Sequence, residues 1–291
     1  MFFMIDIALA TYTQLPDLDA DNALLIPALA ERGLRARPVV WNDPSVDWSL
    51  PKVTVIRSTW DYHHQRSTFL AWAEGVARLH DLWNPLELLR WNTHKFYLRD
   101  LEQQDIPIIP TLWLEQGTRA DLAVLMKQHG WPKVIIKPAV SASAYATMLV
   151  TVATVQAGQA HLDQLLSTAD MLLQPFLSTV TSSHERSLIF IAGQYTHAIE
   201  RMPALDLDLS GQDRLIVPQE EELLLSRKIL GLLPVAPLYA RVDLIQDEAG
   251  TLCLMELELV EPGLWLAYAP HAVQLFADAL ARAMKVSVFQ C

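Results

Sequence analysis

Short apolar runs alternate with amphipathic stretches along the first hundred residues. The runs at 5–10, 36–41 and 53–57 have the length and composition of buried strands, whereas residues 21–32 have helical periodicity and stop before Gly33. This alternation predicts a βαβ-type opening with a mainly parallel sheet. Such sheets bind ligands beyond the carboxyl ends of their strands.

Polar residues follow the third of these runs, at the predicted carboxyl end of a strand. The segment 57–62 reads Arg-Ser-Thr-Trp-Asp-Tyr, and it is a candidate substrate wall in which Arg57, Thr59 and Asp61 contact the ligand. An ordinary polar loop, with Arg57 paired to Asp61, is an equally open alternative.

The pattern changes after helical stretches at 67–80 and 92–104. Shorter strands at 108–114, 134–137, 148–152 and 171–174, with a helix at 120–129, predict a smaller α+β segment. The remainder has strands at 188–191 and 195–201, a helix opened by 218–222, strands at 237–245 and 252–260, and an amphipathic terminal helix. We therefore expect an α/β unit followed by α+β units, with bounds 1–104, 105–178 and 179–291.

Two glutamates interrupt the apolar run at 252–260. Glu256 and Glu258 point to the same face of a strand, with Cβ atoms about 7 Å apart, where unpaired anions would raise each other's pKa. The strand at 237–245 carries Arg241 and Asp243 at the same spacing. One aspartate and two glutamates form a hard-oxygen set that suits Mg²⁺ when the ion also holds phosphate.

A lysine stands at the end of another apolar strand. Lys137 is followed by a run of small and hydroxylated residues that includes Ser141 and Ser143. A buried lysine needs an anionic partner, and backbone amides in such a loop could approach phosphate oxygens. A plain small-residue turn is the alternative, and this segment taken alone favours it.

The sequence Gln-Pro-Phe-Leu at 174–177 ends the next strand. Its proline removes one ladder donor, so the segment could act as a hinge with an apolar face for a flat heterocycle. Three arginines, Arg186, Arg201 and Arg241, stand in or beside predicted strands, where a carboxylate or phosphate partner is expected. Structural salt bridges to the nearby acids are the alternative reading for all three.

The amino-acid composition of the chain limits the classes of function that it can have. The chain has 291 residues, 52% of them hydrophobic, with a net charge of −11, which argues against a general nucleic-acid surface. An anionic ligand then needs a local basic pocket. Two cysteines provide no disulfide framework, and neither a signal peptide nor a membrane span is evident, so the cytoplasm is the default expectation. The many apolar residues of the N-terminal unit would suit a homodimer.

The order of these pieces is more specific than any one of them. A helical lysine, Lys-Pro with a small-residue loop, Gln-Pro-Phe-Leu, Glu-Arg, a second arginine, Arg-x-Asp and Glu-x-Glu together resemble the ATP-grasp superfamily, especially the glutathione-synthetase and RimK-type ligases. The first eighty residues would be the Rossmann-like pre-ATP-grasp domain. Glu-x-Glu, Arg-Ser-Thr-Trp-Asp and Lys-Pro-Ala-Val-Ser also resemble a narrower branch, which includes the O-ureido-serine cyclo-ligase that closes the ring of D-cycloserine.

This resemblance implies ATP and Mg²⁺ as cofactors and assigns roles to individual residues. Lysines would contact the nucleotide phosphates, the hinge would hold adenine, and Glu185 or His184 would lie near the ribose. Arginines would face phosphate or the substrate carboxylate, and three acids would hold the metal. In that order, the residues are Lys95 and Lys137; Gln174, Pro175, Phe176 and Leu177; Glu185; Arg186 and Arg201; and Asp243, Glu256 and Glu258.

Three departures from the family pattern bear on function. Alanine occupies the usual glycine positions of the phosphate loop, at Ala142, Ala144 and Ala146. Glu258 stands where asparagine is usual, and His184 stands where relatives often carry an acid. Our first hypothesis is an ATP-dependent ligase that phosphorylates a small amino-acid-like carboxylate and forms a C–N bond, between molecules or within one. The alternatives are a nucleotide-binding protein without turnover and acids that serve only as salt-bridge partners.

Overall fold

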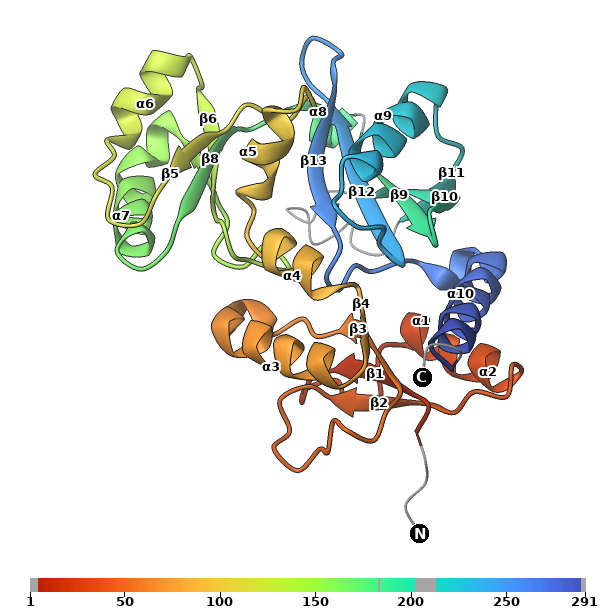
Figure 1. The fold of residues 1–291 in the computed structure, drawn as a ribbon. Coiled ribbons are helices and arrows are strands. Elements are labelled where there is room, and N and C mark those ends of the chain that lie inside the picture. The colour runs from red at the N-terminus through yellow and green to blue at the C-terminus, as the bar shows by residue number, and fades with distance from the viewer. Residues whose placement is uncertain (1–4, 183, 202–212, 289–291) are drawn as a thin grey trace.

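The computed structural model describes residues 5–182, 184–201 and 213–288, which form three sheets with flanking helices (Figure 1). The N-terminal sheet is wholly parallel, as its sequence pattern predicts, and has the order β2-β1-β3-β4. Every residue of β1 and β3 is buried, which is typical of parallel strands covered on both faces. The strands are β1 (Ile7–Thr11), β2 (Ala36–Val40), β3 (Val53–Ser58) and β4 (Asp81–Trp83).

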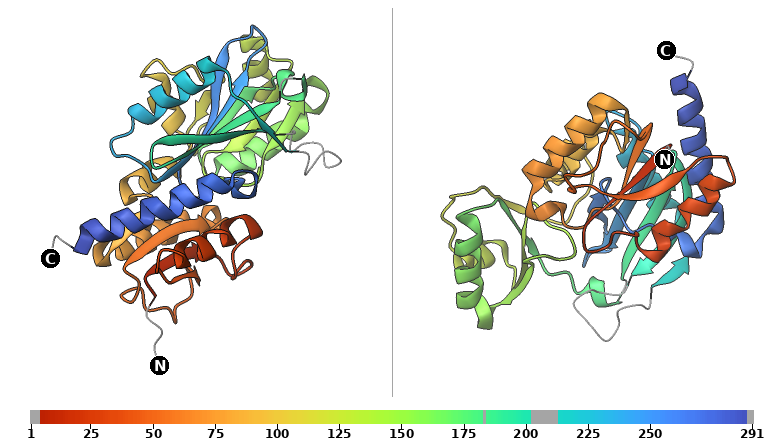
Figure 2. Two further views of the ribbon diagram at one scale, coloured as in Figure 1. Left: turned by 90° about the vertical axis from the view of Figure 1, so that its right-hand side faces the viewer. Right: turned by 90° about the horizontal axis from the view of Figure 1, so that it is seen from below.

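Helices cover both faces of this sheet. The helix expected at 21–32 is divided at Leu24 into α1 (Ala20–Ala23) and α2 (Leu25–Ala30), and Asp19 caps the first by accepting from two backbone amides. The other face carries α3 (Arg66–Leu79). The C-terminal helix α10 (Pro270–Val288) returns to lie beside α2, so the last segment of the chain packs against the first (Figure 2).

The small antiparallel sheet has the order β5-β8-β6-β7, and helices α6 and α7 lie together on one of its faces (Figure 1). Helix α7 approaches β7 closely at Gly158, where a Cβ atom would lie 2.7 Å from the methyl groups of Val150. The elements are β5 (Leu112–Leu114), α6 (Leu122–His129), β6 (Lys133–Pro138), β7 (Met148–Thr151), the short helix η2 (Val152–Thr154), α7 (Val155–Leu166) and β8 (Met171–Pro175).

The large antiparallel sheet has the order β11-β10-β9-β12-β13. Leu188, Val242 and Leu257 on one face form a core with residues of α4 and α5, while Ile189 and Ile191 on the other face pack with the N-terminal unit and α10. The elements are α4 (Leu86–Asn92), α5 (Tyr97–Glu102), α8 (Thr179–Ser182), β9 (Glu185–Ile191), β10 (Gln194–Arg201), β11 (Arg214–Ile216), α9 (Glu220–Gly231), β12 (Tyr239–Gln246), β13 (Leu252–Glu258) and η4 (Leu266–Tyr268).

Lys95 departs from its expected place on a helix. It lies in the turn between α4 and α5, and its backbone N–H donates to the carbonyl of Ala139 at 2.7 Å. That hydrogen bond ties the turn to the end of β6. The lysine is therefore held between the small sheet and the large one.

A buried polar seam joins the N-terminal sheet to the large sheet. Arg57 at the end of β3 is fully buried, and its guanidinium donates to Asn22 Oδ1 at 2.7 Å and to the carbonyl of Pro262 at 2.9 Å. It also lies 4.6 Å above the ring of Tyr239, whose hydroxyl is 2.8 Å from the carbonyl of Ile56. This geometry corrects the expectation that Arg57 contacts a substrate, because its donors are used within the N-terminal unit and between that unit and the segment after β13.

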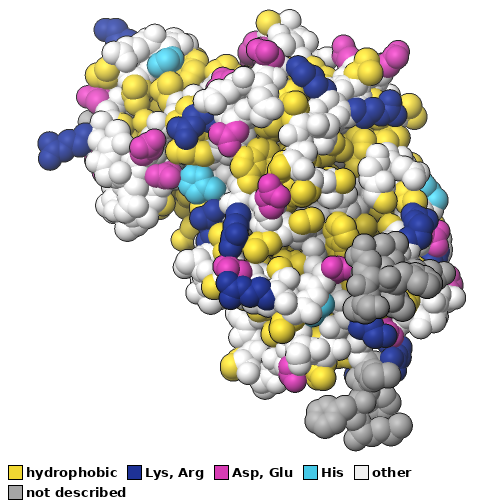
Figure 3. Space-filling model, in the orientation of Figure 1, with side chains coloured by type: hydrophobic (Ala, Val, Ile, Leu, Met, Phe, Trp, Pro, Cys, Tyr) yellow, Lys and Arg dark blue, Asp and Glu magenta, His cyan; other side chains and the backbone are white. Residues whose placement is uncertain are grey.

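Charges of both signs are interspersed over the face of the molecule seen in Figure 3. Among the described helices, none has the length and apolar character needed to cross a membrane.

We expect Arg57→Ala to lower the free energy of unfolding by about 3 kcal/mol, because it leaves buried acceptors at Asn22 and Pro262 without a donor. Denaturant unfolding measures the loss. Arg78→Ala, at an arginine whose side chain is 75% exposed, is the matched control and should cost less than about 1 kcal/mol. Unchanged stability in the Arg57 variant would contradict this structural role and would favour a role of Arg57 in ligand binding.

Candidate functional site

A cleft of about 650 Å³ lies between the small sheet and the large sheet. Its wall includes the ends of β6 and β8, one face of β13 and a loop of the N-terminal unit. Four cationic and four acidic residues line it, while the rest of the wall is largely apolar. The charged residues are Lys95, Lys137, Arg201, Arg241, Glu185, Glu256, Glu258 and Glu261.

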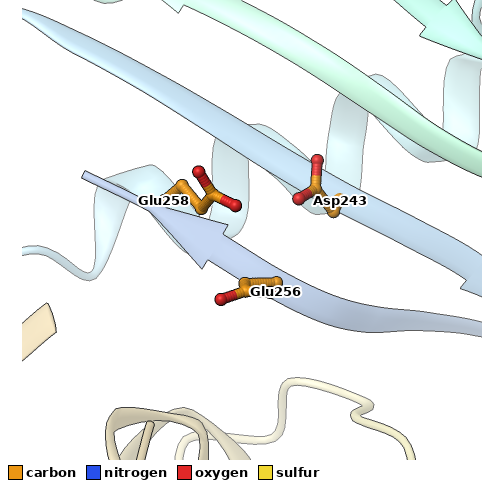
Figure 4. A group of neighbouring side chains, drawn as sticks. All are labelled: Asp243, Glu256 and Glu258. Atoms are coloured by element: carbon orange, nitrogen blue, oxygen red, sulfur yellow. The ribbon is translucent and has the colours of Figure 1, made fainter. Parts of the chain in front are cut away.

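The register of β12 on β13 brings three carboxylates together. Asp243 pairs across the ladder with Glu256, and Arg241 pairs with Glu258, so all four side chains belong to one local surface. One oxygen from each of the three acids lies within 4.8 Å of the other two (Figure 4). Carboxylate oxygens at such separations fit a hard divalent cation such as Mg²⁺. Asp243 is further fixed by Ser187, whose hydroxyl donates to it at 2.6 Å.

Two cations compensate this acidic group. Arg241 donates to Asp243 at 2.8 Å and also pairs with Glu258, and Lys95 lies 2.7 Å from Glu256. Burial alone would raise the pKa of Glu256, but Lys95 and Lys137 outweigh it and lower that pKa to about 2. Burial raises the pKa of Glu258 to about 7, because Arg241 only partly offsets it. The pKa values of the two glutamates therefore differ widely.

Lys137 has no ion-pair partner within the part of the chain that the structure describes. Its burial lowers the pKa of its ammonium group to about 8, although Glu256 partly opposes that shift. A lysine in that position gains stability from any anion that enters the cleft. Phosphate oxygens are the natural candidate, because the three carboxylates in the same cleft could hold a Mg²⁺ ion that also binds phosphate.

The loop after β6 adopts the backbone that glycine would favour. Ser143, Ala144 and Ala146 have φ values of +50°, +55° and +53°, in the left-handed region. At two of the three expected glycine positions, Ala144 and Ala146, alanine thus retains a glycine-like conformation at a steric cost. Ser141 is buried, and its carbonyl accepts from Lys95 at 2.9 Å.

The end of β8 provides an apolar slot. Gln174 is buried and donates to Thr111 at 2.8 Å, so its side chain is already used. Pro175, Phe176 and Leu177 line the cleft beside Ile109, Ile135, Val180 and Met255. A flat heterocycle fits such a slot, with backbone groups of the hinge as polar contacts.

The arginines divide between the cleft and the opposite face of the large sheet. Arg201 lines the cleft and lies 2.5 Å from Glu185, and both Arg201 and Arg241 lie over the ring of Trp265, at 5.4 and 5.3 Å. Burial raises the pKa of Glu185, an effect that Asp243 reinforces and Arg201 opposes. Arg186 is elsewhere, because alternate residues of a strand face opposite ways.

This placement corrects the expectation that Arg186 faces phosphate or substrate. Its guanidinium pairs with Glu222 of α9 and lies 3.6 Å from Glu200. The salt-bridge alternative therefore describes this arginine.

The predicted substrate wall is also revised. Asp61 accepts from the indole of Trp41 at 2.8 Å, and Thr59 is fully buried. Neither lines the cleft, whereas Trp60 and Tyr62 from the same segment do. Tyr62 begins the short helix η1 (Tyr62–His64), which turns alternate side chains of this segment toward the cleft.

Sequence reasoning missed several cleft residues. Trp265 and Glu261 follow β13 in a segment that has no periodic pattern. Outside the cleft lining, Tyr145 of the phosphate loop packs against His63 and His64, with ring centroids 5.1 and 5.0 Å apart. A Glu-Pro-Gly sequence directly after the Glu-x-Glu strand was the available signal for Glu261.

Comparison with known proteins identifies the family. Residues 7–84 match the family model described as the N-terminal domain of D-cycloserine synthetase DcsG. The cycloserine biosynthesis protein DcsG of Streptomyces lavendulae is 30% identical, over 96% of this chain and 99% of that protein. This chain belongs to the DcsG family of ATP-grasp ligases.

Solved structures agree with this family membership. The crystal structure of D-cycloserine synthetase DcsG superimposes with a TM-score of 0.86 at 27% identity, over 95% of this chain and 99% of that one. The D-alanine–D-alanine ligase of Bacillus anthracis, solved with ATP, has a TM-score of 0.68 at 12% identity, over 99% and 100% of the two chains, and shares the fold. The predicted ATP-grasp fold is thus confirmed, and this DcsG-family chain is an ATP-dependent ligase that forms C–N bonds.

The raised pKa of Glu258 predicts a stability difference in metal-free protein. Between pH 4.5 and about 7 the folded chain holds a proton on Glu258 that the unfolded chain has lost, so stability falls as pH rises. Glu258→Gln keeps the neutral form at every pH. We expect it to be more stable than the parent by about 2 kcal/mol at pH 8 and nearly equal at pH 4.5.

Denaturant unfolding in EDTA at the two pH values measures this difference. Glu115→Gln, at a side chain that is 71% exposed, is the control and should follow the parent at both. A Glu258 variant with the parent's pH dependence would show that its carboxylate is charged throughout.

Proposed function

We propose that this chain uses ATP to phosphorylate a small amino-acid-like carboxylate and then joins the acyl group to a nitrogen, with ring closure within one substrate molecule as the first candidate reaction. The observation that carries this proposal is the presence, in one cleft, of a three-carboxylate group and Lys137, a half-buried lysine without an ion-pair partner in the described chain. The DcsG relatives are a cycloserine biosynthesis protein and a D-cycloserine synthetase, and this supports the ring-closing choice.

The nucleotide would occupy the side of the cleft formed by the small sheet. Adenine would enter the apolar slot beside Phe176 and Leu177, and the phosphates would meet Lys95, Lys137 and the loop at Ser143. The left-handed residues of that loop favour exposed backbone amides, which are suitable phosphate donors.

The metal would be held by the carboxylate group of β12 and β13. Asp243, Glu256 and Glu258 offer oxygen ligands only, which fits Mg²⁺. When bound, the ion would neutralise charge on the phosphates. Because Glu258 adds a carboxylate where the superfamily usually has asparagine, we expect tighter ion binding and a greater need for nearby cations.

The acid substrate would lie beside Arg201 and Arg241. Both guanidinium groups reach the cleft and both lie over Trp265, which limits their movement. Their positive charge would orient the substrate carboxylate toward the nucleotide and stabilise negative charge that develops during phosphoryl transfer. The step that forms the C–N bond needs no protein nucleophile, because the substrate's own nitrogen displaces phosphate from the acyl group.

The alternative readings explain less. Salt bridges do hold Asp243, Glu256 and Glu258, but that reading gives no role to Lys137 in the same cleft, which has no ion pair among the described residues. Binding without turnover is suggested by the alanines of the phosphate loop, yet two of them, Ala144 and Ala146, keep the left-handed backbone. A homodimer stays a prediction of the apolar N-terminal sequence.

We expect Glu256→Gln to lower substrate-dependent ADP release at least about 100-fold, because it removes a metal ligand and the partner of Lys95. Coupled-enzyme assays of ADP, run with O-ureidoserine, D-alanine, serine and other amino acids, provide the measurement. Glu115→Gln is the matched charge-removal control outside the cleft and should keep full activity. Full activity in the Glu256 variant would contradict the metal assignment.

A further inference from the structure

Glu261 is a buried acid at the cleft that has no role in the proposed reaction. It follows β13 and is 8% exposed. Its backbone carbonyl accepts from the indole of Trp60 at 3.2 Å, so the N-terminal unit fixes its position. Glu261 lines the same cleft as the lysines and arginines of the site.

The carboxylate of Glu261 has no ion pair in the described ranges 5–182, 184–201 and 213–288. Burial, reinforced by the nearby charge of Glu258, raises the pKa of its carboxyl group to about 8. Lys95 is the cation that most favours its charged form, but that lysine is already bound to Glu256 at 2.7 Å and to Ser141 at 2.9 Å. Arg57 donates to the adjacent carbonyl of Pro262.

A buried acid of this kind is costly unless a positive partner arrives from outside the chain. The opposite charge is found elsewhere in the same cleft, where Arg201 and Arg241 lie over Trp265. Both arginines already pair with acids of the cleft, so a substrate carboxylate would share or replace those partners. The wall thus offers an anion and a pair of cations to one ligand. An amino acid in its zwitterionic form matches both.

We propose that Glu261 binds the protonated amino group of the substrate, while the arginines face its carboxylate. This inference rests on the proposed function and adds to it a specificity rule: the ligase selects acids that carry an amine. Trp60 and Tyr62, which line the cleft with Glu261, would enclose that end of the ligand. Enclosure strengthens the ammonium–carboxylate contact, because the surroundings exclude water.

The test compares each amino acid with the same acid lacking its amine. The probes are O-ureidoserine, D-alanine and serine, paired with 3-(ureidooxy)propanoate, propanoate and 3-hydroxypropanoate. Calorimetry on protein loaded with Mg²⁺ and a non-hydrolysable ATP analogue measures binding, so turnover is not required. We expect the parent protein to bind at least one amine-bearing probe about 10- to 100-fold more tightly than its partner.

Glu261→Gln should remove that preference. It should weaken binding of the amino acid about 10- to 100-fold and leave the affinity for the des-amino acid within about threefold of the parent value. Glu261→Asp, which keeps the charge, should retain part of the preference and serves also if the glutamine variant folds poorly. Glu115→Gln should behave as the parent does.

Three results would overturn the inference. They are an equal loss for both members of each pair, no preference in the parent, and a raised Mg²⁺ requirement for nucleotide binding in Glu261→Gln, which would make this acid a metal ligand. Failure of the proposed function is a separate result, because the parent would then not bind the magnesium–nucleotide complex at all.

Discussion

The antiparallel register between β12 and β13 is the constraint on which the site depends. It sets Arg241 opposite Glu258 and Asp243 opposite Glu256, so a two-residue alternation on each strand becomes a compact group of four charges. A slip of one residue would turn the glutamates toward the core formed with α4 and α5. Leu254 and Leu257, both buried, therefore fix the same register that the carboxylates need.

The charges of the cleft are arranged for exchange of partners. Arg241 and Lys95 currently neutralise the acids that would hold Mg²⁺, so neither the cations nor the acids are buried without compensation. Entry of a magnesium–nucleotide complex would give the acids a metal and the cations a phosphate. Such an exchange costs less than binding to bare buried charges, because desolvation has already been offset within the protein. Lys137 and Glu261 are outside this arrangement, which is why each indicates a ligand group of opposite charge.

Much of this arrangement could be predicted from sequence, where local periodicity determines it. The spacing of Glu256 and Glu258 in an apolar run requires a shared face, and Lys137 at a strand end indicates a cleft edge. Periodicity could not decide which parity of β9 faces the cleft, so Arg186 was assigned with Glu185 although their side chains diverge. Arg57 and Asp61 were misassigned for another reason. Their partners, Pro262 and Trp41, lie far away in sequence, and only tertiary packing brings them together.

Trp265, a cleft residue that sequence reasoning missed, lies where the backbone is irregular, as the phosphate loop does. Trp265 has a φ of +47°, and three residues of the phosphate loop have similar left-handed values. Conformations of this kind cost about 1 kcal/mol or more each in residues other than glycine, so they persist only where surrounding contacts impose them. At Trp265 those contacts include the two arginines and Asp213, which accepts from the indole at 2.9 Å. The strain is therefore balanced by interactions that also hold the arginines in the cleft, which links backbone conformation directly to the geometry of the site.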